Sequence, residues 1–274
     1  MIAFANCKIN LGLRILRRRP DGYHDIETVM VPVPWCDIVE ANPSETGADS
    51  LAVTGNRVDC PVEKNLAMRA LTALRKVASF PATDLRLHKI VPDGAGLGGG
   101  SADAAFTVRA INDLYGLELG ADRMAAVLSQ VGSDCPFFVY DRPMLATGTG
   151  TTLTPAGVSL TGWHIVIAKP RGVAVSTAAA YAGVSPCEEG ETLTEILHLP
   201  VDEWRGRLTN DFEKGIFAAA PQVRMVRDTL YNMGAAYAAM SGSGAAVFGL
   251  FRQAPDDLRL RTQLYNCDRF TARL

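Results

Sequence analysis

The chain has 274 residues, enough for one large domain or two smaller ones with a substantial core. Hydrophobic residues make up 48% and charged residues 20% of it, which is ordinary globular composition. The formal net charge is −2, so the chain lacks the basic field of a dedicated nucleic-acid binder. Its longest apolar runs are far too short to span a bilayer. We therefore expect neither nucleic acid nor a membrane as a partner.

The cysteine pattern points to a reducing compartment. Six cysteines are scattered along the chain, without a C-x-x-C pair and without histidine at zinc-finger spacing. This usage is typical of reduced, mostly buried thiols. The opening residues MIAFANCKIN contain lysine and asparagine too early for the hydrophobic part of a secretion signal. A cytoplasmic location is the resulting expectation.

The first segment of the chain reads as a β-hairpin. Apolar residues recur at every second position over residues 3–15, a period of two that predicts a strand with two distinct faces. The sequence RRPDGYH then supplies a Pro-Asp-Gly turn. We expect the return strand over residues 25–33 and another short strand over residues 35–41.

Helices and one further strand follow. Residues 63–78 place apolar side chains on one helical stripe, which predicts an amphipathic helix. Residues 83–91 alternate again and lead into a glycine-rich loop. Helix signals then run from Ser101 to Tyr115, before Gly116, and a second helix is expected over residues 121–131.

The second half of the chain reads as a separate α+β unit. The turn-rich stretch GTGTTLTPAG suggests a boundary near residue 155, giving domains 1–155 and 156–274. The elements expected after it are a strand at 163–170, a helix at 222–234, strands at 235–240 and 245–251 joined by an SGSG turn, a helix at 255–265 and a strand at 269–274. The order strand, helix, strand, strand, helix, strand indicates a sandwich of the split βαβ type.

The glycine-rich loop is the strongest functional signal. Five glycines fall within the seven residues Gly94–Gly100. A P-loop requires Gly-Lys-Ser/Thr, and this loop has no lysine. The glycines also fit G-x-G-x-x-G, but the acid that motif needs, Glu118, follows residues that read as helix rather than strand. The favoured interpretation is a phosphate cradle of backbone amides at a helix N-terminus, with a ligand-free turn as the alternative.

Two further patterns could accompany such a cradle. Asn6, Lys8 and Asn10 share one face of the first strand, which is either a solvent-facing edge or a functional face. Asp134, in VGSDCPFF, is either a turn residue or the proton acceptor that phosphoryl transfer to an alcohol needs. The SGSG turn is either a hairpin connection or a second nest of backbone amides.

Together these motifs resemble a known family. The early KIN, the loop PDGAGLGGGSADAA and the late SGSGA resemble the three motifs of the GHMP small-molecule kinases. The loop variant G-L-G-G-G-S, with RPDGYHDIETVM, KNLAMRA and VGSDCPFF, resembles one branch whose substrate carries a cytidine diphosphate group. The likeness runs in order through nearly the whole chain.

The resemblance implies a fold and an activity. The fold would be α+β, the two-domain GHMP kinase fold, with an N-terminal ribosomal-S5-like domain and a C-terminal ferredoxin-like domain. The activity would be phosphorylation of an alcohol group by ATP with Mg²⁺, through metal ligands that the sequence does not identify. The partner would be a small molecule with a cytidine diphosphate group, and a homodimer is left open.

The resemblance also assigns residues. Lys8 would be the catalytic lysine and Asp134 the catalytic base. The substrate would contact five residues, namely Asn10, Tyr23, His24, Thr177 and Tyr181. ATP would contact Asn65 and Lys89 at its adenine end, and its phosphates would be wrapped by the loop residues Pro92, Asp93, Gly94, Ala95, Gly96, Leu97, Gly98, Gly99, Gly100, Ser101 and Ala102.

Two departures and two alternatives accompany this assignment. Asn6-Cys7 replaces the family's Pro-Ala, and Ala102 replaces the second serine of the loop. One alternative is a homoserine- or mevalonate-type kinase, although Tyr181 and the Tyr23-His24 pair would have no base to bind on those smaller substrates. The other is a non-catalytic binding module that retains the fold.

Overall fold

The computed structural model describes residues 1–274. Contacts within the chain divide it into two compact units, each assembled from three stretches of sequence. The first unit comprises Met1–Lys8, Pro32–Asp93 and Gly98–Arg142, and the second comprises Ile9–Val31, Gly94–Leu97 and Pro143–Leu274. These units follow contacts rather than chain order, so the boundary near residue 155 stays a prediction.

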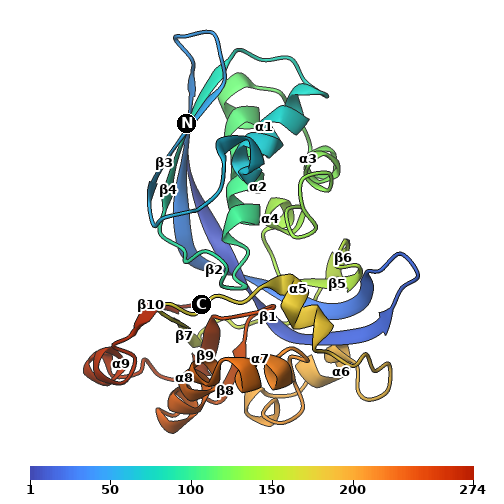
Figure 1. Cartoon of the computed structure of the whole chain (residues 1–274), viewed down its shortest axis with the longest axis vertical. Helices are drawn as coiled ribbons and strands as arrows, with labels where there is room; N and C mark the ends of the chain where they lie inside the picture. The colour runs from blue at the N-terminus through green and yellow to red at the C-terminus, as the bar shows by residue number, and fades with distance from the viewer. The chain divides into compact units, whose positions relative to one another are not determined.

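Strands and helices are mixed along the chain, as expected for an α+β protein (Figure 1). The strands are β1 (Ile2–Arg18), β2 (His24–Pro43), β3 (Ser50–Gly55), β4 (Thr83–Lys89), β5 (Met144–Gly148), β6 (Thr152–Pro155), β7 (His164–Pro170), β8 (Tyr237–Met240), β9 (Val247–Phe251) and β10 (Cys267–Arg273).

The helices include every one that was predicted with bounds, and short ones that lie mainly after residue 170, where a helical region was expected without bounds. The α-helices are α1 (Leu66–Arg75), α2 (Gly99–Tyr115), α3 (Ala121–Leu128), α4 (Phe137–Tyr140), α5 (Thr177–Ala182), α6 (Leu193–Leu197), α7 (Glu213–Ala219), α8 (Pro221–Asn232) and α9 (Asp257–Gln263), and the 3₁₀ turns are η1 (Val62–Lys64) and η2 (Val201–Glu203). None of them combines the length and the apolar character that a bilayer crossing requires.

The N-terminal hairpin differs from its prediction in one respect. The two strands expected at 25–33 and 35–41 are one continuous strand, β2. β2 pairs with β5 through residues 26–30 and with β4 through residues 38–43, and it also pairs with β1. Pro32 and Pro34 lie between the β5 and β4 pairings, so neither of these two ladders needs a donor from them.

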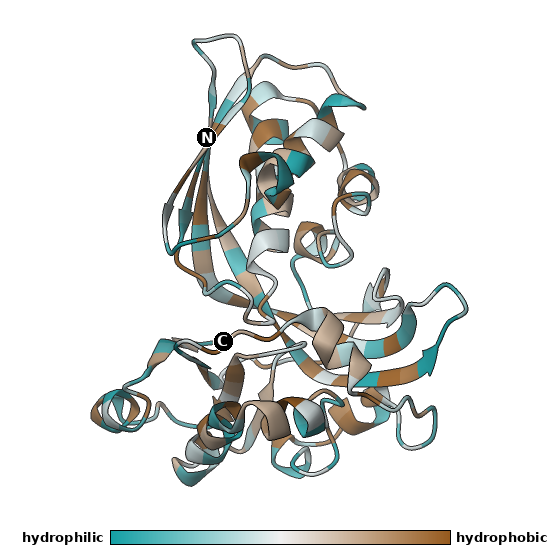
Figure 2. Ribbon diagram, in the orientation of Figure 1, coloured by the Kyte–Doolittle hydropathy of each residue, from teal (hydrophilic) through white to brown (hydrophobic).

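Hydropathy along the hairpin matches the predicted alternation, but burial does not. The hairpin ribbon alternates between hydrophobic and hydrophilic colours (Figure 2). Yet all residues from Ala5 to Leu13 are buried, including the polar ones. The polar face of β1 is therefore not a solvent-facing edge, and Lys8 needs a compensating partner.

In the first unit, helices cover one side of a small sheet. β3 pairs in parallel with β4, and β4 pairs antiparallel with β2. Helices α1 to α4 all lie on the same side of these strands (Figure 1). α1 buries Ala67, Ala70, Leu71 and Leu74 and packs against α2. β3 was not predicted from the sequence, because most of its side chains are exposed and its apolar pattern is weak.

In the second unit, the expected split βαβ topology is confirmed. The strands lie in the order β10-β7-β9-β8, and each neighbouring pair is antiparallel. α8 packs against β7, β8 and β9. The core of this unit is aromatic, with Trp204, Phe212, Tyr237 and Phe248 almost fully buried.

All six cysteines are free thiols. Cys7, Cys135 and Cys267 are buried, whereas Cys60 and Cys187 are exposed. The expectation of mostly buried thiols therefore holds for only half of them. Burial raises the pKa of Cys7 to about 12, which keeps this thiol protonated at neutral pH.

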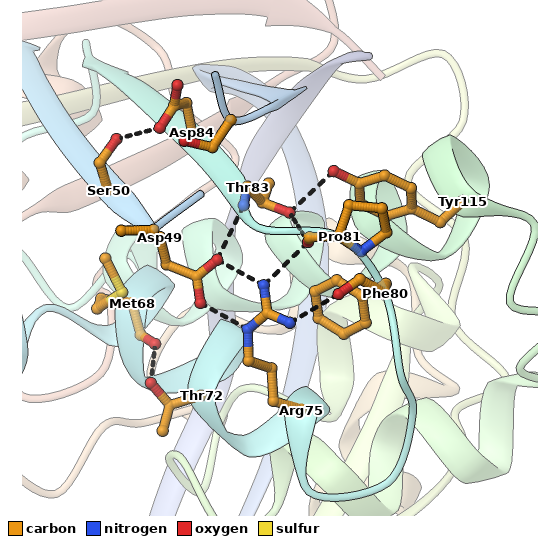
Figure 3. Close-up of polar contacts among 12 residues, drawn as sticks. Asp49, Ser50, Met68, Thr72, Arg75, Phe80, Pro81, Thr83, Asp84 and Tyr115 are labelled. Carbon is orange, nitrogen blue, oxygen red and sulfur yellow. Dashed lines mark hydrogen bonds and ion pairs between the residues drawn. The ribbon is translucent and has the colours of Figure 1, made fainter. Parts of the chain in front are cut away.

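An arginine at the end of α1 ties this helix to β4 (Figure 3). Arg75 makes two hydrogen bonds of 2.5 Å to the Asp49 carboxylate, and it also donates to the carbonyls of Phe80 and Pro81. Asp49 in turn accepts the backbone N–H of Thr83, the first residue of β4. One planar guanidinium thus joins three chain segments, a geometry that the point charge of lysine does not reproduce.

We predict that Arg75→Lys lowers the free energy of unfolding by about 1–3 kcal/mol, because carbonyls and a carboxylate lose their donors. Urea unfolding followed by circular dichroism measures this change. Arg86→Lys is the matched control, because Arg86 is exposed and lies 3.9 Å from Glu40, and it should change stability by less than about 0.5 kcal/mol. Equal effects of the two substitutions would contradict the assignment.

Candidate active site

The first unit brings Lys8 and Asp134 together. Lys8 lies on β1, and Asp134 lies in the turn between α3 and α4. The Lys8 Nζ atom is 3.5 Å from the Asp134 Oδ2 atom. The lysine side chain is 5% exposed and the aspartate side chain 36% exposed. Asp134 therefore compensates a buried ammonium and at the same time presents a carboxylate to solvent, where a substrate hydroxyl could reach it.

The glycine loop alternates left-handed glycines with residues that are not left-handed, which is the spacing that an anion-binding nest requires. Gly94, Gly96 and Gly98 have φ of +59°, +75° and +70°, whereas Ala95 and Leu97 between them are not in the left-handed region. Alternation of right- and left-handed residues turns successive N–H groups toward one concave side. Only glycine adopts this conformation routinely, which explains the spacing of these three glycines.

The loop ends in a helix whose first amides have no side-chain cap. α2 begins at Gly99, two residues before the start expected at Ser101, and its N-cap is Gly98, which makes no side-chain hydrogen bond. The first amides of a helix lack partners within the helix and carry the positive end of its dipole. This end of α2 therefore has amides free to donate, and their contact with a phosphate stays a prediction.

Gly98 also fits tightly against the catalytic candidate. A Cβ atom at this position would lie 3.1 Å from the Cγ and Cε atoms of Lys8 and 3.0 Å from the Phe138 ring. The absence of a side chain therefore lets the lysine stem pack against the last residue of the loop. Both the backbone conformation and the close contact require glycine here.

Ser101 lies close to the turn that carries Asp134. Burial raises the pKa of Cys135, in that turn, to about 11, and the Ser101 hydroxyl partly offsets this rise. The neighbouring loop position, Ala102, has no hydroxyl and is fully buried. Ser101 is thus the one residue of the loop 92–102 that carries a hydroxyl, and it lies in the first turn of α2.

Magnesium would fit the Ser101 hydroxyl. The chain has no group of three or more His, Cys, Asp or Glu side chains arranged to hold a metal ion. Mg²⁺ does not need such a cage, because it keeps several waters and is bound by one or two protein oxygens together with substrate phosphates. The Ser101 hydroxyl is an oxygen donor of the required kind.

The two residues assigned to the adenine end have other contacts. Asn65 caps α1, since its Oδ1 atom accepts the N–H of Ala67 at 3.0 Å. The Lys89 ammonium is buried and donates to the carboxylates of Asp37 and Asp103. Burial alone would lower the pKa of Lys89, but the two carboxylates together raise it. Contact of Asn65 and Lys89 with adenine stays a prediction.

In the second unit, the SGSG turn holds the middle of the glycine loop. The Ser241 hydroxyl donates to the Gly96 carbonyl at 2.9 Å and accepts the N–H of Asn10 at 3.2 Å. A side chain on Gly96 would overlap the backbone oxygen of Ser241. The Asn10 amide donates to Thr28 Oγ1 at 2.9 Å, which fixes its orientation.

A residue that was not singled out from the sequence, Asn210, holds the SGSG turn through hydrogen bonds to its backbone. The buried Asn210 amide donates to the carbonyls of Met240 and Gly242 at 2.9 and 2.8 Å. The motif SGSG was a visible signal for Ser241. No pattern around Asn210 marked it, because a lone asparagine in a loop has many equivalent explanations.

The second unit also brings together the residues assigned to a cytidine. The rings of His24 and Tyr181 stack with centroids 4.9 Å apart at an angle of 23°, and Phe212 supports Tyr181 edge-on. Thr177, the first residue of α5, shares a hydrogen bond of 3.1 Å with Ser243 in the SGSG turn. His24, rather than Tyr23, stacks on Tyr181, and the side chain of Tyr23 is largely exposed.

Comparisons with known proteins place the chain in a family. Residues 65–142 match the family model of the GHMP kinases N terminal domain, and residues 196–266 match that of the GHMP kinases C terminal. A protein of Parabacteroides distasonis, named 4-diphosphocytidyl-2-C-methyl-D-erythritol kinase, is 48% identical over 253 residues, which cover 92% of each chain.

Solved structures agree with the sequence relatives. A crystal structure of 4-(cytidine 5′-diphospho)-2C-methyl-D-erythritol kinase matches with a TM-score of 0.81 and 30% identity, over 99% of this chain and 98% of that one. The mevalonate kinase of Methanococcus jannaschii matches with a TM-score of 0.72 at 13% identity, over 100% of this chain and 98% of that one, which is a likeness of fold alone.

The fold and the two matched domains define a small-molecule kinase of the two-domain α+β type. The chain belongs to the GHMP kinase family and, within it, to the 4-diphosphocytidyl-2-C-methyl-D-erythritol kinases.

We predict that Gly98→Ala lowers kcat at least tenfold, because the added Cβ displaces the Lys8 stem. The left-handed backbone alone should cost about 1–2 kcal/mol of stability. Gly116→Ala is the matched control: Gly116 caps the opposite end of α2 with φ +59°, and a Cβ there would meet nothing within 4 Å. Steady-state kinetics and thermal unfolding of both variants make the comparison. An equal loss of kcat in the two variants would mean that strain, not Lys8, is responsible.

Proposed function

We propose that this chain transfers the γ-phosphate of ATP to the 2-hydroxyl of 4-diphosphocytidyl-2-C-methyl-D-erythritol, a step in non-mevalonate isoprenoid precursor biosynthesis. The observation that carries the proposal is the Lys8–Asp134 pair, 3.5 Å apart, with the last glycine of the loop packed on the lysine stem. The printed names of the relatives support the choice of substrate.

The reaction needs a proton acceptor at the attacking oxygen. Asp134 is the half-exposed carboxylate of the pair and accepts the proton of the 2-hydroxyl. The hydroxyl oxygen then bonds to the γ-phosphorus, the bond from that phosphorus to the bridging oxygen breaks, and ADP leaves. The ammonium of Lys8 offsets the negative charge of the transferring group.

The loop and the start of α2 hold the phosphates. The nest at Gly94, Gly96 and Gly98 supplies backbone amides, and the first turn of α2 adds further donors. The Ser101 hydroxyl would hold Mg²⁺ together with phosphate oxygens, and the ion neutralises phosphate charge when bound. Fixed backbone dipoles suit this chemistry, because phosphoryl transfer depends mainly on positioning and electrostatics.

The cytidine end of the substrate is assigned to the second unit. Tyr181 offers an aromatic face that Phe212 braces, and His24 lies against it. Aromatic stacking on a base is worth roughly 1–3 kcal/mol by alanine substitution in nucleic-acid systems. Asn10, Tyr23 and Thr177 complete the proposed substrate contacts.

The free cysteines fit a reducing compartment, and we place the reaction in the cytoplasm.

A coupled ATPase assay tests the substrate assignment. It compares 4-diphosphocytidyl-2-C-methyl-D-erythritol with mevalonate and homoserine, the alcohols of the alternative kinases. Turnover with the first alcohol alone is expected. Turnover only with one of the other two would replace the substrate, and binding of nucleotide without turnover of any alcohol would favour the non-catalytic module.

We predict that Asp134→Asn lowers kcat by about 10²–10⁴-fold, the usual contribution of a general base, while a non-hydrolysable ATP analogue still binds. Single-turnover kinetics and calorimetry measure the two quantities. Asp113→Asn, on the exposed side of α2, controls for loss of a carboxylate in the same unit. A kcat close to that of the unsubstituted enzyme would reduce Asp134 to a turn residue.

We predict that Tyr181→Ala raises the KM for the diphosphocytidyl substrate at least tenfold, about 1.4 kcal/mol, and leaves the KM for ATP nearly unchanged. The reason is loss of the ring that stacks on the base. Tyr181→Phe retains that ring and should keep the KM within about threefold. Initial rates with each substrate varied in turn decide the matter, and a rise in the KM for ATP alone would place Tyr181 at the wrong end of the site.

A further inference from the structure

A buried cluster of three charged side chains lies beneath the glycine loop in the first unit. Asp37 comes from β2, Lys89 is the last residue of β4, and Asp103 lies in the second turn of α2. Their exposed fractions are 0%, 4% and 2%. The Lys89 Nζ atom donates to Asp37 Oδ2 and, at 2.6 Å, to Asp103 Oδ2. Ionised groups are rarely buried this deeply unless they are paired.

Asp37 fixes the start of the loop. Its Oδ1 atom accepts the backbone N–H groups of Ile90 and Val91 at 2.5 and 2.8 Å. These are the two residues that leave β4 and enter the glycine loop. Its other oxygen accepts the Lys89 ammonium, so both carboxylate oxygens of Asp37 serve as acceptors. This carboxylate cannot be replaced by a group that also donates.

The same cluster supports the end of the loop. A Cβ atom on Gly99, the first residue of α2, would lie 3.5 Å from Asp37 Oδ2 and 3.5 Å from Lys89 Nζ. The first turn of the helix therefore lies beside the ion pair, with no room for a larger residue than alanine between them. Residues before and after the phosphate nest thus share one buried support, formed by Asp37 and Lys89.

Asp103 has a different position in the cluster. One ammonium faces two carboxyl groups, so a single cation does not balance both negative charges. The Asp103 Oδ1 atom is buried and has no hydrogen-bond partner, whereas both oxygens of Asp37 are bonded. A neutral side chain of the same shape could accept the lysine hydrogen bond equally well.

We propose that Asp37 and Lys89 are positioning residues for ATP, which hold the two ends of the glycine loop at the spacing its amides need, and that the negative charge of Asp103 is dispensable. The proposal rests on the proposed function insofar as the loop binds ATP. It assigns Lys89 an indirect role: its ammonium acts through Asp37 and the loop backbone.

Two isosteric substitutions in the same cluster test this. Asp37→Asn introduces an NH₂ group that faces either two backbone N–H donors or an ammonium, so the loop entry shifts. We expect the Kd of a non-hydrolysable ATP analogue and the KM for ATP to rise at least tenfold, with the KM for the alcohol within about twofold. Asp103→Asn keeps an acceptor for Lys89, and its ATP affinity should stay within about twofold.

The difference in ATP affinity between Asp37→Asn and Asp103→Asn is the informative result. A purely structural cluster would lower the melting temperature in both and leave the nucleotide affinity of the folded protein unchanged, which would overturn the proposal. Equal tenfold losses of ATP affinity in both variants would show that the charge of Asp103 is needed as much as that of Asp37, which contradicts the proposal.

A second variant and a direct binding measurement cover the cases in which Asp37→Asn does not fold or the substrate assignment fails. If Asp37→Asn does not fold, Lys89→Gln carries the test, because it frees the second oxygen of Asp37, and unchanged ATP affinity in that variant contradicts the proposal. Calorimetry with the ATP analogue does not depend on which alcohol is phosphorylated, so failure of the substrate assignment leaves the test intact. An unsubstituted protein that binds no ATP analogue would contradict the proposed function and this inference together.

Discussion

The site depends on one constraint: a stretch of backbone must present its own amides, and side chains would obstruct it. Gly94, Gly96 and Gly98 take left-handed conformations in alternation. At Gly96 a side chain would overlap Ser241, and at Gly98 it would press on Lys8. A backbone held this way is pre-organised for an anion, so little free energy is lost in ordering it when the ligand binds.

Two lysines of the first unit are buried, and they differ in how many carboxylates they contact and in how exposed those carboxylates are. Lys8 pairs with one carboxylate that remains half-open to solvent, which suits proton transfer at a substrate hydroxyl. Lys89 is enclosed between two carboxylates and donates to both. The first ammonium acts at the reacting atoms in our account, and the second holds the chain that surrounds them.

The sequence predicted the parts of this molecule that local pattern controls. The strand period of β1, the helix after the glycines and the strand order of the second unit follow from side-chain spacing and turn residues. Patterns of three or four residues do not report long-range partners. Asp37 and Asp103 were therefore not singled out from the sequence, and two strands were predicted where β2 is continuous.

The most direct test of the central claim is a crystal structure with a non-hydrolysable ATP analogue and Mg²⁺. The account predicts phosphate oxygens about 2.7–3.2 Å from backbone amides of the loop and the first turn of α2, with the left-handed φ of Gly94, Gly96 and Gly98 retained. Phosphates held by side chains elsewhere, with these amides bonded only to water, would contradict it.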